Sequence, residues 1–429
     1  MNRLQAYLDA VPLHFMLVAA GAALALALFV PTRHRVTFSL ILLPLSLTVS
    51  RLGDIGTLQV LAKTTSPALF WVVTVAALTD RRAKLALPSG IWILPLTGIM
   101  GAVLVSRSSD SSLAIVLETS WLSLTVAALC IARLITDWIA LRQIVFAFAL
   151  GVSLSLLIPA TSIIIAPGEA FGTGLARFTP YGANPNQIGT LFILGPALLI
   201  YCALTSPSRN MMFWFALTAS LALGMGVATA SRSVILATLI SLAPLVVMFA
   251  RRPGVAAALL AIFAAVGAFV WIQIGDFVSL GRLQSLESAR ASIFLEYIRI
   301  IMDRPFLGIF QSSGLSYFVS QEIGSNPHNS FLRILYVGGI TYAFPILAFQ
   351  FVAIAASINL WVRRKRFYYD PMFPRLLVGM QFAFVFQGML TASLYHPTFT
   401  WAFANILFST FSVVLARSNV NHESRQSLT

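Results

Sequence analysis

Three basic residues from separate parts of the chain, Arg232, Arg290 and His328, could act together on an anionic substrate. His328 stands where a polar loop gives way to a long apolar stretch. Because Pro327 disfavours helix at Asn326, we expect that helix to start at about His328. An imidazole there can take a proton from a hydroxyl group near neutral pH. An ordinary polar helix entry has the same pattern, so the spacing alone leaves both interpretations open.

Arg232 lies between two serines near the middle of an apolar run that extends from Met211 to Ala250. As one helix, this run of about 40 residues would be about 60 Å long, twice the hydrocarbon core of a bilayer. We therefore expect the chain to turn back at Arg232, at a membrane surface. Such an arginine can hold a phosphate through paired hydrogen bonds, or it can simply reach the lipid headgroups.

Residues 289–305 fit an amphipathic helix that lies on the membrane or packs over the spans. Its apolar face carries Ile293, Phe294, Tyr297 and Ile301, and its polar face carries Glu296, Arg299 and Asp303. Arg290 falls on the apolar face, which a solvated arginine avoids, so we expect it to point inward at a partner. Two guanidinium groups, Arg232 and Arg290, suit a diphosphate and would stabilise its charge as a leaving group. The sequence has no His, Asp and Glu cluster with metal-ligand spacing, so neither a metal nor a cofactor is expected.

The loop 166–187 supplies further binding candidates. It is rich in Gly, Pro and Asn, which predicts turns rather than a helix. Its Arg177, Asn184 and Asn186, with nearby backbone N–H groups, could bind sugar hydroxyls or phosphate. An ordinary connecting loop is the alternative.

Three more residues are candidates by position. Asn329 adjoins His328 and could bind substrate, and His396, in a short loop, is a second imidazole that could reach the same site. Glu118 falls inside a predicted apolar span, where a carboxyl group is either functional or buried in its protonated form.

The composition defines the class of protein. Hydrophobic residues make up 58% of the 429 residues, charged residues 10%, and the mean hydropathy is +0.87. Apolar runs of about 20 residues recur from end to end, which predicts an all-α, polytopic transmembrane helical bundle. The net charge of +14 then reflects basic loops between spans, and no nucleic-acid partner is expected. Cys130 and Cys202 fall inside apolar runs and predict buried thiols without a disulfide.

We predict one integral membrane domain over residues 1–429. Its spans are expected near 12–30, 36–50, 58–78, 87–105, 113–132, 143–165, 187–204, 211–228, 233–249, 255–273, 329–361, 376–394 and 398–416. If the spans alternate in direction, one set of loops holds most of the 28 Lys and Arg residues and is assigned to the cytoplasm.

The opposite, outer side then receives the N-terminus, the turn at Arg232 and the long loop 274–328, which carries the amphipathic helix. A cleaved signal peptide is a weaker interpretation of the first span, because its leading segment contains Asp9 and a single basic residue. The polar tail 418–429 is expected to be flexible and cytoplasmic.

The order of these motifs resembles the O-antigen ligase and O-antigen polymerase superfamily of bacterial envelopes. The resemblance covers roughly residues 180–345. It rests on four features in chain order: Asn184-Pro185-Asn186 before a span, Ser231-Arg232-Ser233 opening a span, Arg290 followed by Arg304-Pro305-Phe306-Leu307-Gly308, and His328-Asn329-Ser330-Phe331-Leu332.

The resemblance implies a GT-C-type fold of about twelve spans in the bacterial inner membrane. It also implies metal-independent, inverting transfer of a glycan from an undecaprenyl diphosphate carrier at the periplasmic face. Arg232 and Arg290 would then bind the diphosphate, and His328 would orient or deprotonate the acceptor hydroxyl. Two positions depart from the family pattern: Phe310 replaces a frequent second glycine, and Val337 replaces a frequent acidic residue nine positions after the histidine.

The acceptor stays open. A ligase would transfer the glycan to the lipid A–core of lipopolysaccharide, and a polymerase of O-antigen or exopolysaccharide would transfer it to another lipid-linked repeat unit. A protein-glycosylating relative would use a hydroxyl side chain. A transporter or flippase for the same lipid-linked glycan is the alternative from another class, and it predicts basic residues along a transmembrane path. A scaffold of a polysaccharide-export complex is a third interpretation, in which Arg232, Arg290 and His328 would not converge.

Overall fold

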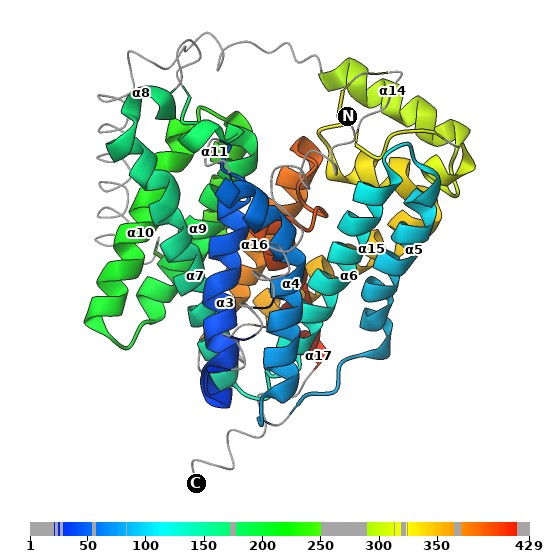
Figure 1. The fold of residues 1–429 in the computed structure, drawn as a ribbon. Helices are drawn as coiled ribbons and strands as arrows, with labels where there is room; N and C mark the ends of the chain where they lie inside the picture. Colours follow the sequence, from blue (N-terminus) through cyan, green and yellow to red (C-terminus); the bar gives the residue numbers. More distant parts are fainter. Residues whose placement is uncertain are drawn as a thin grey trace.

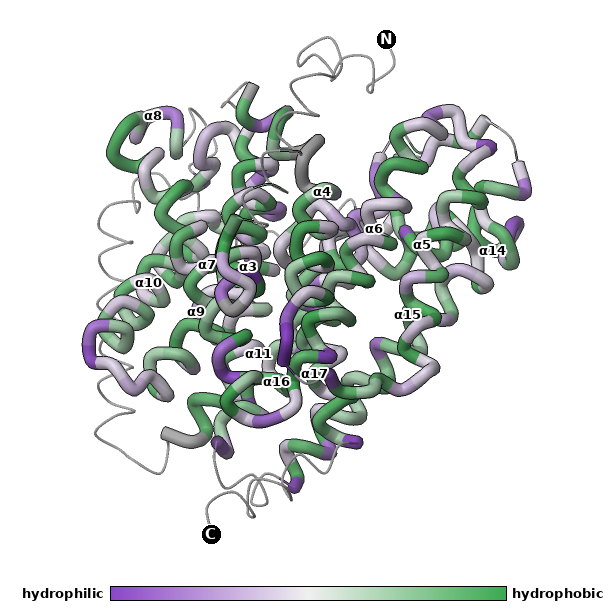
Figure 2. The backbone as a smooth tube through the Cα atoms, turned by 60° about the horizontal axis from the view of Figure 1, so that its bottom comes forward, coloured by the Kyte–Doolittle hydropathy of each residue, from purple (hydrophilic) through white to green (hydrophobic). Residues whose placement is uncertain are grey.

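The structure is a computed structural model, and it describes residues 29–53, 57–82, 84–171, 177–249, 290–312, 314–318, 323, 325–363 and 370–417, with Gly21 and Ala25. In these ranges the chain is helical and contains no strand. Eight of the described helices are long and apolar enough to cross a membrane, so this is a multi-pass membrane protein. Figure 2 shows the apolar colour along the helices and the strongly hydrophilic segments mainly at helix ends and connections.

The helices pack as one bundle (Figure 1). The first half contains α3 (Thr32–Val49), α4 (Thr57–Thr79), η1 (Ser89–Trp92), α5 (Ile93–Leu104), η2 (Val105–Arg107), α6 (Ser111–Ala132), α7 (Trp138–Ile165) and α8 (Pro167–Ala170). The second half contains η3 (Pro180–Gly182), α9 (Pro185–Thr205), α10 (Arg209–Ala228), α11 (Arg232–Phe249), α14 (Arg290–Asp303), η4 (Gly308–Gln311), α15 (Ser330–Val362), α16 (Phe373–Leu390) and α17 (Thr400–Arg417).

Most predicted spans coincide with helices to within a few residues. The largest shift is at 143–165, because the helix α7 starts at Trp138, where the Asp137 side chain caps it by accepting the Ala140 N–H at 2.7 Å. The predicted span 255–273 lies outside the described residues, as does 12–30 apart from single positions. Both cysteines are buried free thiols, as predicted.

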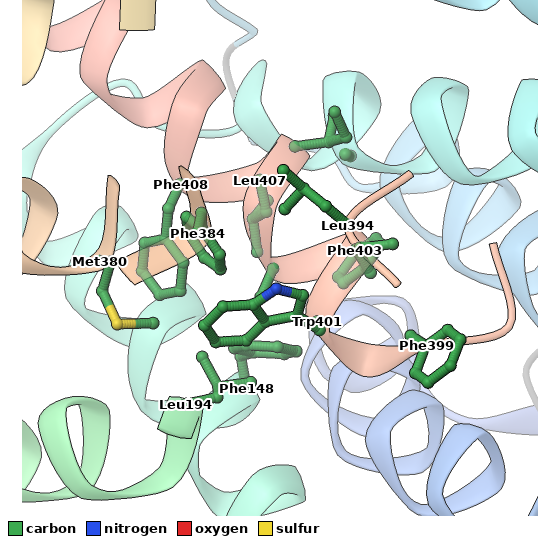
Figure 3. Close-up of a cluster of buried hydrophobic side chains, with 14 of the residues drawn as sticks. Phe148, Leu194, Met380, Phe384, Leu394, Phe399, Trp401, Phe403, Leu407 and Phe408 are labelled. Carbon is green, nitrogen blue, oxygen red and sulfur yellow. The ribbon is translucent and has the colours of Figure 1, made fainter. Parts of the chain in front are cut away.

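The middle of the bundle is built around α17, which is buried from Thr400 to Leu415. Trp401 sits in its first turn with no exposed surface, 4.5 Å from the Phe384 ring, and Figure 3 shows further large apolar side chains around it. The same helix presents Ser409 to Gln381 of α16, which in turn accepts a 2.7 Å hydrogen bond from Gln350 of α15. Apolar packing and this short series of side-chain hydrogen bonds together fix α15, α16 and α17 against one another.

One end of the bundle gathers the connections that the sequence assigns to the outer side. Gly53 donates to the Tyr181 carbonyl at 2.6 Å, and Phe178 donates to the Ala228 carbonyl at 2.8 Å. Ser109 donates to the Leu315 carbonyl at 3.0 Å. Figure 1 shows α8 and α14 at this same end, on opposite sides of it. We call it the α14 end, defined by the described connecting residues 50–53, 105–110, 166–171, 177–182, 229–231, 304–312, 314–318, 325–329 and 391–399.

The opposite end gathers the basic connections. Leu85 donates to the Arg133 carbonyl at 2.6 Å, and Tyr201 donates to the buried Asp370 carboxylate at 2.6 Å. The connection between α4 and α5 lies there in Figure 1. These contacts agree with the predicted grouping for the connections that they join, and the assignment of the two ends to the two sides of a membrane stays a prediction.

The long helix α15 is interrupted at Gly339, whose φ of 61° and ψ of −163° lie outside the helical range. The segment Pro305–Gly308 docks at this kink, where Ile340 donates to the Pro305 carbonyl at 2.7 Å and Thr341 donates through its hydroxyl to the Phe306 carbonyl at 2.7 Å. A Cβ on Gly339 would overlap the Phe306 carbonyl group, so only glycine allows this approach.

Candidate functional site

The start of α9 explains the Asn184-Pro185-Asn186 motif. Asn184 is the N-cap, and its side-chain oxygen accepts the Asn186 N–H at 3.0 Å, while Pro185 occupies the first helical turn. The predicted turn loop before it also contains one helical turn, α8, which starts at Pro167. That short helix is a correction to the sequence analysis, because a proline in the first turn favours a helix start.

Arg177 joins this loop to the turn before α11. Its Nε donates to the Thr229 carbonyl at 2.8 Å, and its Nη2 donates to the Asn186 side-chain oxygen at 3.1 Å. Ser231 donates to the same oxygen at 3.0 Å. Three candidate residues from the loop, Arg177, Asn184 and Asn186, are therefore brought together with the serine that precedes Arg232.

The chain does turn back at Arg232, as predicted. α10 ends at Ala228, Ala230 has a φ of 47°, and α11 begins at Arg232. The Arg232 side chain is exposed at the α14 end, beside the buried Ser231. Ser231 thus anchors the turn that carries Arg232.

His328 also lies at the α14 end and is exposed. The helix starts two residues later than predicted, because Asn329 caps it: its side-chain oxygen accepts the N–H groups of Phe331 at 2.9 Å and Leu332 at 3.0 Å. His328 has a φ of 47°, and its N–H donates to the Asn326 side chain at 2.9 Å. The imidazole is thereby held out of the helix, and the Asn329 oxygen is occupied by the cap.

Glu118 is the centre of a buried group of polar side chains next to the start of α15. Its carboxylate accepts the Tyr317 hydroxyl at 2.9 Å on one oxygen and the Tyr342 hydroxyl at 2.7 Å on the other. The Arg333 guanidinium lies over the Tyr317 ring, 4.9 Å from its centroid. Glu118 from α6 therefore connects the loop before α15 to α15 itself.

A small cavity lies among these side chains. It is lined by Glu118, Tyr317, Ser330, Arg333, Ile334, Val337, Tyr342, Ala392 and Tyr395. Val337 of α15 and Glu118 of α6 both line it, so a carboxylate reaches the cavity from a second helix.

The connection 391–399 lines the cavity with Ala392 and Tyr395, and it carries His396. Ser330 donates to the Thr391 carbonyl at 2.6 Å and accepts the Leu394 N–H at 3.0 Å, which fixes this connection to the start of α15. The His396 Nδ1 lies 2.8 Å from the Thr398 hydroxyl. Burial, and then the charges of Arg333 and Arg51, hold the pKa of His396 well below its usual 6.5, so this imidazole is neutral at pH 7.

Arg51 links the two halves of the α14 end. Its Nε donates to the Thr398 carbonyl at 3.1 Å, and its guanidinium lies 3.5 Å from the centroid of the Phe399 ring. Gly53, two residues later, bonds to Tyr181 in the Arg177 loop. A continuous set of contacts therefore runs from the Arg177–Asn186 group to the start of α15.

Arg290 begins α14, which is the amphipathic helix that the sequence predicts. Tyr297 and Ile300 are buried on it, and the Tyr297 hydroxyl donates to the Ser325 carbonyl at 2.7 Å. Its outer face also exposes Leu295, Ile298 and Met302 beside the predicted charges. The Arg290 side chain lies outside the described residues, so its inward orientation stays a prediction.

Three residues of this site were not singled out from the sequence: Arg333, Tyr395 and Arg51. Arg333 could have been singled out by the same argument as Glu118, because it is also an ionisable residue inside a predicted span. Arg51 directly follows the predicted span 36–50, and Tyr395 adjoins His396. Their contacts come from segments far apart in the chain, which spacing alone does not reveal.

Among the described residues, no group of three or more His, Cys, Asp and Glu side chains is placed to hold a metal ion. The arrangement at the α14 end instead offers cationic groups, amides and two imidazoles. No protein-family model matches the chain, and a search of curated proteins finds no match.

Proposed function

We propose that this protein is a membrane glycosyltransferase that moves a glycan from an undecaprenyl diphosphate carrier to an acceptor hydroxyl. One observation carries the proposal: the loop with Arg177 and Asn186, the turn at Arg232, the start of α14 and the exposed His328 all lie at one end of the bundle. These are the segments whose order resembles the O-antigen ligase and polymerase superfamily.

In this proposal the α14 end faces the periplasm of a bacterial inner membrane. The basic connections at the opposite end, such as those with Arg82, Arg133 and Arg209, favour the cytoplasm by the positive-inside rule. The lipid-linked donor would approach from the outer leaflet, with the polyprenyl chain in the membrane and the diphosphate at the level of Arg232.

The reaction is a single displacement. The acceptor oxygen attacks the anomeric carbon and forms the new glycosidic bond as the bond to the diphosphate oxygen breaks, so the configuration inverts. His328 takes the proton of the acceptor hydroxyl, and the bonding electron pair leaves with the diphosphate. Arg232 and Arg290 stabilise the negative charge that grows there. The chemistry needs no cofactor.

The acceptor is a further glycan unit, lipid A–core or another hydroxyl. We favour a polysaccharide polymerase or ligase over a protein-glycosylating enzyme, because the outer loop 274–328 is short for docking a protein acceptor. Purified enzyme in nanodiscs, given its native lipid-linked repeat unit with and without lipid A–core, separates the first two. Ladders of lipid-linked glycan without core mark a polymerase, and product formed only with core marks a ligase.

His328→Ala is the test variant, and we expect it to abolish product while the protein still folds, because the side chain is exposed. His34→Ala is the matched control, since His34 is exposed at the opposite end. Lack of product from the wild type with either acceptor would refute the transferase proposal. Movement of the intact lipid-linked glycan across the membrane would then indicate the transporter.

A further inference from the structure

The cavity next to the start of α15 contains two hydrogen-bond donors that are not used. Arg333 is 9% exposed, and its Nη2 has no hydrogen-bond partner. The Tyr395 hydroxyl is also buried without a partner. Both residues line the same cavity. Leaving two such groups unpaired is costly, which indicates that something absent from the protein itself pairs with them.

The carboxylate in the cavity does not fill this role. Its two oxygens accept the tyrosine hydroxyls, and the Arg333 Nη2 makes no hydrogen bond to either of them. Within the described ranges, the one ion pair closer than 4.0 Å is Arg82–Asp80, at the opposite end of the bundle. Arg333 therefore carries its charge without a carboxylate in contact.

The Tyr395 hydroxyl can donate a hydrogen bond at neutral pH. Burial raises the pKa of Tyr395 above its usual value, so the hydroxyl keeps its proton at neutral pH. Its ring packs edge-on against Trp121 and Phe331, each at 6.0 Å between centroids, and this holds the hydroxyl in the cavity.

The size of the space limits what can enter. The cavity has room for about one oxygen-sized atom. The space without protein atoms is about 260 Å³ in all, a volume that includes open solvent, so the cavity is not sealed. The Arg333 guanidinium is a charged donor and the Tyr395 hydroxyl is a neutral one. Two such donors that face the same small space are complementary to a negatively charged oxygen atom.

We propose that Arg333 and Tyr395 form a binding site for one anionic oxygen of the substrate. The oxygen belongs either to the diphosphate of the carrier lipid or to a carboxylate on an acidic sugar of the glycan. This inference rests on the proposed function, and it adds a third anion contact to those expected from Arg232 and Arg290.

The test measures binding, so it does not depend on turnover. Purified protein in detergent is titrated by calorimetry with inorganic pyrophosphate, with glucuronate and, as a neutral probe, with glucose. Pyrophosphate binding that depends on Arg333 and Tyr395 assigns the oxygen to the diphosphate, and glucuronate binding that depends on them assigns it to an acidic sugar.

Tyr395→Phe is the sharpest variant, because it removes only the unpaired hydroxyl. We expect it to weaken binding of the recognised anion about tenfold, the effect of one hydrogen bond to a charged group, with a thermal midpoint no lower than that of the wild type. Arg333→Gln should weaken binding about a hundredfold or more. Arg209→Gln and Tyr201→Phe, at the opposite end, are the controls and should bind as the wild type does.

Binding of neither anion, or binding that Tyr395→Phe and Arg333→Gln leave unchanged, overturns the proposed anion site and leaves a water molecule as the partner of the two donors. The outcomes also separate this inference from the proposed function. Normal glycan transfer by both variants with their anion binding intact would refute the site alone. Selective anion binding in a wild type that transfers no glycan would refute the transferase alone.

Discussion

The backbone N–H of Ile340 donates a 2.7 Å hydrogen bond to the carbonyl oxygen of Pro305. This contact joins two sequence motifs that are 35 residues apart, the Arg304–Gly308 segment and the double glycine of α15. The segment 305–308, at the start of the loop before α15, is thereby fixed to the kink of the same helix.

Gly339→Ala tests the attachment. A Cβ would overlap the Phe306 carbonyl group and would also disfavour the φ of 61°, so we expect a loss of about 2–4 kcal/mol in unfolding free energy. The measurement is unfolding in mixed detergent and SDS micelles. Gly314→Ala is the control, since Gly314 has a φ of 85° but open space around it, and it should lose only about 1 kcal/mol. Equal losses would show that the close approach at Gly339 is not tight.

Gly101→Ala tests the support of Glu118. A Cβ on Gly101 of α5 would overlap one Glu118 carboxylate oxygen and would lie 2.9 Å from the Tyr342 ring. We expect a loss of about 1–3 kcal/mol, because the carboxylate must leave its tyrosine partners. Gly90→Ala, which has nothing within 4 Å, should be close to neutral in the same assay. A wild-type midpoint for Gly101→Ala would argue against close packing of α5 on this carboxylate.

Arg290→Lys tests the diphosphate contact in the proposed reaction. Lysine keeps the charge but lacks the paired N–H geometry, so we expect at least a tenfold fall in glycan transfer at unchanged expression. Arg299→Lys, an exposed arginine of the same helix, is the matched control and should retain activity. Near-normal transfer by Arg290→Lys would remove Arg290 from the site.

The proposed mechanism also predicts that EDTA does not inhibit transfer, because the arginines take the role that a divalent cation has in other transferases. The assay compares initial rates before and after chelation, with Mg²⁺ added back. Loss of activity that the added metal restores would contradict charge stabilisation by arginine alone.

The stability of the protein should fall in mild acid through His396. Its pKa is held well below 6.5 in the folded protein, whereas the unfolded chain takes up a proton near pH 6.5. The unfolded state then binds more protons, so this contribution is fully present above about pH 6.5 and is lost as the pH falls, by up to about 1.4 kcal/mol per pH unit.

The measurement is the thermal midpoint between about pH 8 and about pH 5. His396→Gln should flatten the acid side of the curve, while His34→Gln at the opposite end serves as the exposed-histidine control. Parallel curves for the wild type and His396→Gln would assign the acid sensitivity to other groups.

Much of the fold follows from local rules in the sequence. The apolar runs exclude any element but a helix across a membrane, and the polar breaks between them set the turns, including the one at Arg232. Alternation of the spans then determines which loops share an end. The Asn184 and Asn329 caps follow local sequence too, although the cap at Asn329 places the helix start beyond His328.

The candidate site was less predictable, because its contacts depend on tertiary packing. Glu118 was identified as an ionisable residue in a span, but its two tyrosine partners come from positions about 200 residues later. Arg333 and Tyr395 come together only when α15 and the connection 391–399 meet at Ser330. Hydropathy describes each segment alone and carries no information on such pairs.

The kink in α15 also bears on how deep the candidate site lies in the membrane. The helix has 33 residues and is about 50 Å long, which exceeds the hydrocarbon thickness of about 30 Å. Its exposed large hydrophobic side chains begin at Ile340 and continue to Val362, and none in this helix precedes the kink. The part of α15 before Gly339, with Arg333, is largely covered by neighbouring segments. If the α14 end is the outer surface, as proposed, we expect this part to lie at the level of the lipid headgroups. A lipid-linked donor could react there with its phosphates at the level of neighbouring phospholipid phosphates, so that no charge has to enter the oily interior.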